Sequence, residues 1–210
     1  MCEIKVVQRT EEWHGLRNRV LLTASAFGDA LGLGRGKPYD FLSWLLSDDK
    51  RDKSDSEMGK IWTEHGIRLE PIVGEAYQLL TGQQTTPSGF WIPVDGDPLS
   101  EMVGASPDAL LYEKSQCGQC AKLIGLVEFK APFYKMYTEG IYQPHAIPRQ
   151  YMAQMQGQMA ICQVPWCDFM AICTATREIM LKRVFFHPIY WVHVSEILKE
   201  FCYLAQVGTC

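Results

Sequence analysis

The sequence predicts an α/β or α+β domain in which helices flank a mixed β-sheet. Three observations support this fold class. Apolar residues from Ile61 to Leu79 recur every three or four positions, which is the spacing of an amphipathic helix. Between positions 90 and 130, short strand-like segments are separated by Gly, Pro and Asp. A helical stretch, further strands and a closing helix follow, so helices precede, interrupt and end the run of strands.

The first third of the chain is predicted to be mostly helical. Short helices are expected at 23–33, with Ser25 near the beginning, and at 39–46. Positions 48–57 carry dense mixed charge and almost no apolar residue, which is typical of a solvated loop. The amphipathic helix comes next. Pro71 within it predicts a kink or a break, because proline cannot donate the helical hydrogen bond.

The rest of the chain alternates between strand-like and helical segments. Runs of apolar and aromatic residues are bounded by turn residues, as strands commonly are. The expected strands are 90–94, 102–105, 109–112, 124–130, 169–174 and 179–186, and the expected helices are 149–162 and 194–205.

Length and composition limit the class of protein. A chain of 210 residues can bury one sizeable core, so we expect one domain over residues 1–210. Hydrophobic residues make up 47% and charged residues 21%, which is typical of a globular protein rather than a disordered one. No apolar run approaches the ~18 residues that a membrane-spanning helix needs. The N-terminus lacks the features of a secretion signal.

Cysteine usage and charge indicate the setting and the partners. Eight cysteines are too sparse for a disulfide scaffold, so we expect a reducing, intracellular setting in cytoplasm or nucleus and no secretion. The net charge of −4 argues against broad, sequence-independent binding to nucleic acid. It is compatible with a narrow channel whose carboxylates are neutralised by bound metal. Cysteines with apolar neighbours, expected in the core, are Cys162, Cys167, Cys173 and Cys202.

Three charged residues support the functional hypothesis. Asp108 opens one predicted strand, and Glu128 and Lys130 lie in the next strong strand. Side chains alternate along a strand, so Glu128 and Lys130 share one face of it. If the two strands are neighbours, Asp108 lies within a few ångströms of Glu128.

Such a pair of carboxylates predicts a metal site. Two carboxylates at close range repel, and each resists ionising unless a cation lies between them. Their hard oxygens suit Mg²⁺ or Mn²⁺, and the backbone carbonyl of Phe129 is a candidate third ligand. A lysine beside the metal can orient or deprotonate an attacking water and stabilise a pentacovalent phosphate.

An ordinary structural explanation competes with this hypothesis. Asp108 would be a turn residue, and Glu128 and Lys130 would form a solvated charged face. Glu-x-Lys triplets occur by chance in many proteins, but this one lies in an apolar strand, where two charges without a function carry a desolvation cost. Pattern and composition leave both explanations open.

A resemblance to a known family favours the functional explanation. Ser106-Pro107-Asp108, then Glu128-x-Lys130 followed by Pro132-Phe133, resembles the PD-(D/E)XK nuclease signature of the lambda-exonuclease family, the YqaJ-type viral recombinases. This implies a restriction-endonuclease-like core. Further blocks that resemble the family, in the same order, are Trp13-His14-x-Leu16-Arg17 with Thr23-Ala24-Ser25, His65-Gly66 leading to Glu70, and Tyr151-Met152-Ala153-Gln154-x-Gln156.

The resemblance implies a role for each matching residue. Asp108 and Glu128 would hold the metals, and Glu70 would complete a second metal site. Lys130 would act on the nucleophilic water, and Gln154 would help to position water or ligands.

The resemblance also implies a pocket for the 5′-phosphate of the digested strand, made by Arg17, Ser25 and Ser106. A guanidinium is a forked donor for phosphate, and hydroxyls near a helix N-terminus add donors. The ordinary alternatives are a surface ion pair of Arg17 with Glu11 or Glu12 and a helix N-cap at Ser25.

Two other features are weaker candidates. Cys117 and Cys120 have the spacing of a zinc knuckle, but no second pair at suitable spacing follows. A glycine-rich loop carries Arg35 and Lys37, which could contact the DNA backbone, but it lacks the Walker spacing.

The resemblance implies a Mg²⁺-dependent exonuclease that digests double-stranded DNA from 5′ to 3′ and leaves 3′ single strands for recombination or repair. A pair of Mg²⁺ ions, with Mn²⁺ as a substitute, would serve each site. Implied partners are double-stranded DNA ends, a single-strand annealing protein and further copies in a homotrimer. The alternatives are another PD-(D/E)XK endonuclease, a flap or single-strand nuclease, or a catalytically silent DNA-binding domain.

Overall fold

The computed structural model describes residues 2–34, 36–47, 57–113, 121–141, 143 and 145–208. Arg35, Cys117, Cys120 and most of the loop expected at 48–57 lie outside the described residues.

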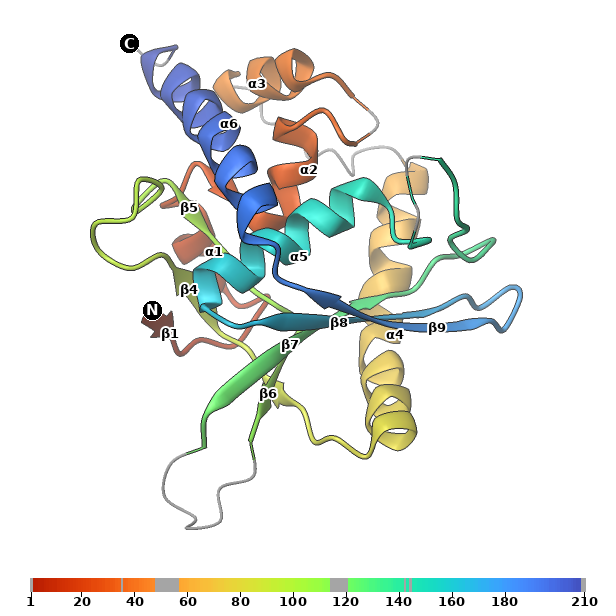
Figure 1. Cartoon of the computed structure of the whole chain (residues 1–210). Coiled ribbons are helices and arrows are strands. Elements are labelled where there is room, and N and C mark those ends of the chain that lie inside the picture. Colours follow the sequence, from red (N-terminus) through yellow and green to blue (C-terminus); the bar gives the residue numbers. More distant parts are fainter. Residues whose placement is uncertain are drawn as a thin grey trace.

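Within these ranges, helices and strands follow one another largely in the predicted order (Figure 1). The helices are α1 (Glu11–Arg17), α2 (Phe27–Ala30), α3 (Pro38–Leu46), α4 (Glu57–Thr81), α5 (Arg149–Cys162) and α6 (Pro188–Val207), with a 3-10 turn, η1 (Ala24–Ala26), before α2. The strands are β1 (Cys2–Ile4), β2 (Leu22–Thr23), β3 (Thr86–Pro87), β4 (Phe90–Ile92), β5 (Val103–Gly104), β6 (Ala109–Tyr112), β7 (Leu123–Lys130), β8 (Trp166–Ile172) and β9 (Ile179–Phe185).

A five-stranded sheet with the order β3-β6-β7-β8-β9 forms the centre of the fold. β7 and β8 run parallel, and the other neighbours run antiparallel. A parallel pair needs a crossover connection, and α5 provides it by crossing one face of the sheet (Figure 1). β1 pairs with β4 and β2 pairs with β5 in two small additional sheets. This is the mixed sheet flanked by helices that the sequence predicts.

Helices cover both faces of the sheet. α5 lies on one face, with α2 and α6 packed against it, and α4 lies on the other (Figure 1). Leu126 and Phe169 belong to the core on the α5 side, whereas Val127 and Tyr77 belong to the core on the α4 side. Because side chains alternate along β7, Glu128 faces α5.

α4 runs without interruption from Glu57 to Thr81, although Pro71 lies inside it. The break that the proline predicts is therefore absent. A proline in a helix interior costs about 3 kcal/mol. Val73 and Tyr77 are buried against the sheet, and the packing of this face offsets the lost hydrogen bond.

The N-terminal boundaries of two predicted helices are wrong. The segment expected as a helix at 23–33 begins with Thr23 paired to Gly104 in a parallel β ladder, so a helix cannot start there. Only η1 and the one-turn α2 follow before Gly32 turns the chain with a φ of 66°. α6 starts at Pro188 rather than at 194, because the His187 side chain caps it by accepting from the backbone N–H of Tyr190 at 3.1 Å.

Two glycines allow α2 to approach α5 closely. A Cβ atom at Gly28 would lie 2.8 Å from the Cα atom of Gln150, and one at Gly157 would lie 2.3 Å from the ring of Phe27. The adjoining η1 turn also contacts α5. Ser25, in the middle of η1, is thereby held beside the helix that faces β7.

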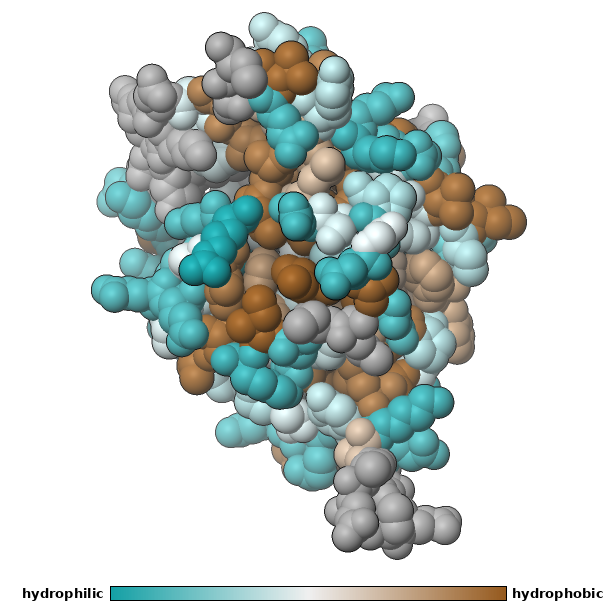
Figure 2. Space-filling view, turned by 90° about the vertical axis from the view of Figure 1, so that its left-hand side faces the viewer, coloured by the Kyte–Doolittle hydropathy of each residue, from teal (hydrophilic) through white to brown (hydrophobic). Residues whose placement is uncertain are grey.

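The distribution of hydrophobic and hydrophilic residues is that of a globular protein, as the composition predicts. On the side that carries the N-terminal strand, hydrophobic residues gather toward the centre and hydrophilic residues surround them (Figure 2). None of the described helices is long and apolar enough to cross a membrane. Among the residues whose burial is described, the free cysteines buried in the core are the four that the sequence predicts there, Cys162, Cys167, Cys173 and Cys202.

Candidate active site

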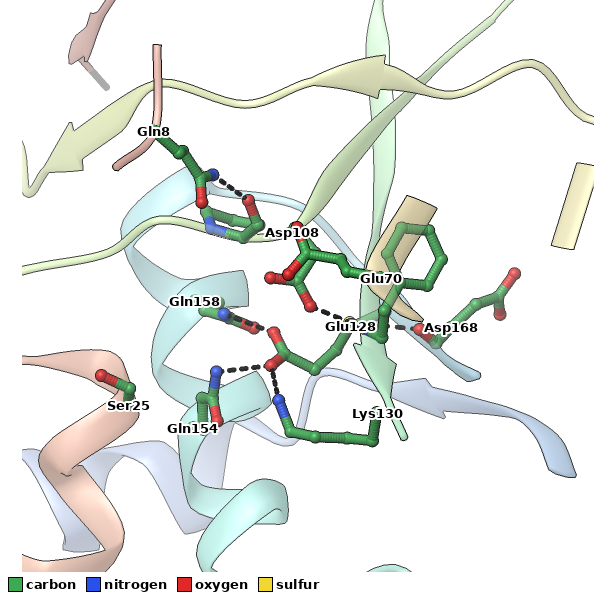
Figure 3. Close-up of polar contacts among 12 residues, drawn as sticks. Gln8, Ser25, Glu70, Asp108, Glu128, Lys130, Gln154, Gln158 and Asp168 are labelled. Carbon is green, nitrogen blue, oxygen red and sulfur yellow. Dashed lines mark hydrogen bonds and ion pairs between the residues drawn. The ribbon is translucent and has the colours of Figure 1, made fainter. Parts of the chain in front are cut away.

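The register of the sheet brings Asp108 close to Glu128. β6 and β7 are antiparallel, with Ala109 opposite Val127, and the same register continued by one residue sets Asp108 opposite Glu128. The Asp108 carboxylate accepts a hydrogen bond from the backbone N–H of Phe129 at 2.7 Å (Figure 3). The two strands are neighbours, which is the condition on which the predicted carboxylate pair depends.

Glu128 is buried, with 1% of its surface exposed. Its Oε1 atom accepts a hydrogen bond from Gln154 at 2.7 Å and forms an ion pair with Lys130. Its Oε2 atom accepts from Gln158 at 2.8 Å (Figure 3). A solvated charged face is therefore the wrong explanation for Glu128, because two amides and one ammonium group replace the water that its carboxylate would otherwise bind.

Without a further cation at the site, Asp108 and Glu128 do not both ionise readily. Burial raises the pKa of Asp108 well above its ordinary value, and the charge of Glu128 raises it further. Lys130 and the N–H of Phe129 oppose this shift without cancelling it. Asp108 thus resists ionising unless a positive charge approaches, and its hard oxygens together with those of Glu128 fit a divalent cation such as Mg²⁺ or Mn²⁺.

Lys130 stays positively charged at this position. Burial alone would lower its pKa, but Glu128 and Asp108 raise it above the ordinary value for a lysine. The Nζ atom also lies 4.9 Å from the centroid of the Tyr151 ring on α5, a distance suited to a cation–π contact. The ammonium group is therefore held between β7 and α5.

Glu70 approaches the site on α4, from the other face of the sheet. It forms an ion pair with Arg9 and, together with Asp108 and Lys130, lines a pocket of about 220 Å³. Among the described residues, no group of three or more His, Cys, Asp or Glu side chains is arranged as a metal-binding cluster. Glu70 therefore lies next to the carboxylate pair without joining it in one cluster.

The predicted phosphate-binding residues form a second connected group. Arg17 donates to the hydroxyls of Thr23 at 3.1 Å and Ser25 at 3.4 Å. Its guanidinium lies 4.4 Å from the centroid of the Trp13 ring. The indole N–H of Trp13 in turn donates to the Ser106 hydroxyl at 2.9 Å. Trp13 thereby connects Arg17 to Ser106.

In the part of the chain that the structure describes, Arg17 does not form the surface ion pair, and Ser25 is not the helix N-cap, that the sequence offers as alternatives. Among the described ion pairs, none joins Arg17 to Glu11 or Glu12. Ser25 lies inside η1, and the N-cap position belongs to Thr23. Burial lowers the pKa of Arg17 from its ordinary value, in keeping with a guanidinium packed inside a cleft.

One cleft of about 790 Å³ contains both groups. The predicted residues that line it are Arg17, Ser25, Ser106, Asp108, Glu128, Lys130 and Gln154. Glu70 and Phe129 line the smaller adjoining pocket, which shares Asp108 and Lys130 with the cleft. Residues distributed from α1 to α5 are thus brought to one place.

Three residues at the site escape the sequence reasoning. Gln158 follows Gln154 by four positions on α5, so both lie on one face of the helix, and this spacing is a signal that could have identified Gln158. Trp13 belongs to the first block that resembles the family, but the sequence gives it no role at the site and does not reveal that its N–H reaches Ser106. Arg9 precedes α1 in a segment without periodicity, so only the structure reveals its position in the cleft.

Several solved structures with a similar fold are described as exonucleases. An alkaline exonuclease (LHK-Exo) from Laribacter hongkongensis aligns with a TM-score of 0.68 and 21% identity, covering 95% of this chain and 94% of that chain. Its complex with dAMP aligns with a TM-score of 0.69 over the same shares. A phage related exonuclease from Haemophilus somnus 129PT aligns with a TM-score of 0.61 and 12% identity, covering 93% and 96%. The predicted fold class, a mixed β-sheet flanked by helices, is confirmed, and the chain shares its fold with these exonucleases.

Residues 12–165 match the YqaJ-like viral recombinase domain. This match covers well over half of the chain, which therefore belongs to the YqaJ-like viral recombinase family, as the sequence predicts. A curated relative, Uncharacterized protein R354 from Acanthamoeba polyphaga mimivirus, is 32% identical over 72 residues. That alignment covers 33% of this chain and 13% of the relative. Family and fold together support the prediction of a DNA-hydrolysing enzyme.

The pKa of Asp108 leads to a prediction about stability. Asp108→Asn keeps an oxygen acceptor for the Phe129 N–H and removes a carboxylate that the fold resists ionising, so it should stabilise the protein in EDTA at pH 7. A gain of roughly 1 kcal/mol corresponds to a rise in Tm of about 2–4 °C for a chain of this size. Because the folded-state pKa is raised, the penalty exists only above the ordinary pKa of aspartic acid, and the gain should shrink as the pH falls toward it.

The measurement is thermal unfolding in EDTA at several pH values, with Asp95→Asn as the control. Asp95 is exposed, so the same change of atoms there should leave Tm nearly unaltered. A Tm of Asp108→Asn at or below that of the unmodified protein at pH 7 would show that Asp108 is not a strained carboxylate.

Proposed function

We propose that this protein is a Mg²⁺-dependent exonuclease that digests double-stranded DNA from 5′ to 3′. The observation that carries the proposal is the lining of a single cleft by two different groups, a carboxylate–lysine group and an arginine–serine group. The first is suited to phosphodiester hydrolysis, and the second is suited to holding a phosphate. Membership in the YqaJ-like viral recombinase family supports the same conclusion.

Asp108 and Glu128 would hold the divalent cations, with the carbonyl of Phe129 as a further ligand, and Glu70 would complete a second metal site. A divalent cation bound there would act as a Lewis acid on the phosphate and lower the pKa of a bound water. Gln154 and Gln158 hold the carboxylate of Glu128 in one orientation, so Glu128 does not have to reorganise when substrate binds.

Lys130 acts on the reacting groups in this proposal. Its ammonium group has three N–H donors, can orient the attacking water, and can offset the charge that develops on the phosphate oxygens. Its contacts with Glu128 and the Tyr151 ring hold it in the cleft before substrate arrives.

The position of the second group supports digestion from the 5′ end. A terminal 5′-phosphate seated among Arg17, Ser25 and Ser106 would set an adjacent phosphodiester near Asp108 and Glu128 in the same cleft. The complex of the structurally similar Laribacter exonuclease with dAMP supports a site that accepts a nucleoside monophosphate. The 3′ single strand left behind would serve recombination or repair.

The proposal includes partners that rest on the family resemblance. Double-stranded DNA ends are the substrate, a homotrimer is the assembly, and a single-strand annealing protein receives the product strand. An endonuclease, a flap or single-strand nuclease and a catalytically silent DNA-binding domain remain the competing functions.

The test is digestion of a linear duplex labelled at either end, with Mg²⁺ or with EDTA. We expect the label at each 5′ end to be released first, only with Mg²⁺, and circular duplex to resist. Cutting of circular duplex at a similar rate would favour an endonuclease. An absence of cleavage with Mg²⁺ and with Mn²⁺ would favour the silent DNA-binding domain.

In the same assay, Lys130→Ala should lower the cleavage rate by at least about 10²-fold, the usual effect of losing one such electrostatic contact. The fold should persist, because Gln154 and Gln158 still hold both oxygens of Glu128. Mn²⁺ binding, measured by calorimetry, should also persist. Lys199→Ala, on the exposed side of α6, is the matched control. Near-normal cleavage by Lys130→Ala would remove the lysine from the mechanism.

The second prediction concerns the phosphate group. Wild type should digest a 5′-phosphorylated duplex faster than a 5′-hydroxyl duplex. Arg17→Ala should bring the ratio of the two rates close to one, because the guanidinium that binds the phosphate is lost. The exposed Arg19, two positions later, supplies the control Arg19→Ala. Rates on both duplexes are compared for all three proteins. If wild type ignores the phosphate, or if Arg17→Ala slows both duplexes equally, the pocket is assigned to the wrong residues.

A further inference from the structure

Arg9 lies at the mouth of the cleft on the segment between β1 and α1, and it lines both the cleft and the adjoining pocket. Its φ of 69° is in the left-handed region, where arginine is less favourable than glycine. The segment is fixed on both sides of it. Gln8 donates to the carbonyl of Pro107 at 2.8 Å, and Thr10 caps α1 by accepting from the N–H of Trp13.

The guanidinium of Arg9 forms an ion pair with Glu70. The side chain of Arg9 is 41% exposed and that of Glu70 is 27% exposed, so the pair stands at the boundary between the pocket and solvent. Asp108 and Lys130 line the same pocket. Arg9 is therefore within the pocket that contains the outermost carboxylate of the site.

Two of the three carboxylates, the buried Glu128 and the partly exposed Glu70, each have their own side-chain cation. Lys130 pairs with Glu128, and Arg9 pairs with Glu70. Lys130 already has a function with the reacting phosphate in the proposed mechanism, and Arg9 occupies the corresponding position at the other carboxylate. A divalent cation that binds Glu70 competes with the guanidinium, because two positive charges on the same carboxylate repel each other.

We propose that Arg9 is a DNA-binding residue that is held on Glu70 until a divalent cation displaces it, after which its guanidinium binds a phosphate of the DNA strand in the cleft. This inference rests on the proposed nuclease function and adds a residue and a sequence of events to it. A guanidinium released from a carboxylate keeps its forked donors and its charge, which are suited to a phosphate. Cation binding and DNA binding are coupled through Arg9.

A purely structural ion pair is the competing explanation. In that case Arg9 fastens the segment before α1 to α4 and contributes only to stability. The two explanations differ in two measurable quantities, which are the affinity for a divalent cation without DNA and the number of phosphate contacts with and without the cation.

The chain offers a matched control for the substitution. Arg177, in the exposed connection between β8 and β9, has a φ of 60°. Arg9→Gly and Arg177→Gly therefore remove the same side chain from the same backbone conformation, which glycine accepts without strain. Arg177 does not line the cleft or its adjoining pocket among the described residues.

The first measurement is Mn²⁺ titration by calorimetry without DNA. Arg9→Gly should bind Mn²⁺ about two- to fivefold more tightly than wild type, the range expected from losing one exposed ion pair that competes with the cation. Arg177→Gly should match wild type. In a Glu70→Gln background the gain from Arg9→Gly should disappear, because Arg9 acts through that carboxylate.

The second measurement is the salt dependence of duplex binding, in a Lys130→Ala background that slows digestion. With Mn²⁺, Arg9→Gly should reduce the slope of log K against log salt by about 0.9, the value for one phosphate contact. Without Mn²⁺ the slope should be unchanged, because Glu70 holds the guanidinium. Arg177→Gly should alter neither slope.

Unchanged or weaker Mn²⁺ binding by Arg9→Gly would overturn the proposal, and so would a slope that changes equally with and without Mn²⁺. Neither measurement depends on cleavage. A protein that shows the coupling but never digests DNA would refute the nuclease function and leave the coupling intact. A protein that digests DNA without this coupling would refute the role of Arg9 and leave the nuclease function intact.

Discussion

The close approach of Asp108 and Glu128 across two antiparallel strands is the constraint on which the rest of the site depends. Burial and mutual repulsion raise the pKa of Asp108, and Glu128 has only 1% of its surface exposed. Without compensation such a pair would destabilise the sheet, because a buried charge needs partners. Lys130 and the two glutamines of α5 supply part of that compensation, and in the proposed function a divalent cation would supply the rest.

The groups around the pair come from elements on both faces of the sheet, and one of them, Glu70, adds a negative charge that raises the pKa of Asp108 further. α5 supplies Gln154 and Gln158, which hold one carboxylate, and α4 brings Glu70 to the other side with Arg9 as its counter-ion. The crossover that joins the parallel strands β7 and β8 is therefore also the element that orients Glu128. Close packing of α2 on α5 then sets the arginine–serine group along the same cleft.

Much of this architecture is predictable from sequence, for identifiable reasons. β6 and α5 match their predicted bounds, because their apolar pattern is strong and turn residues flank them. The order of the family motifs also indicates that Asp108 and Glu128 approach each other. Prediction from the sequence pattern fails where tertiary packing determines the local structure. The uninterrupted helix at Pro71 and the β ladder at Thr23 are two examples. Such prediction also fails where a residue contributes through one long-range contact, as Arg9 does.

The central claim is that Asp108 and Glu128 together hold a divalent cation, and it is tested most directly by crystallography with anomalous scattering. A crystal of the protein soaked in Mn²⁺ should show an anomalous difference peak between these two carboxylates, and a crystal of Asp108→Asn treated in the same way should lose it. A crystal with no peak there, or with Mn²⁺ bound only at other positions, would contradict this account of the site.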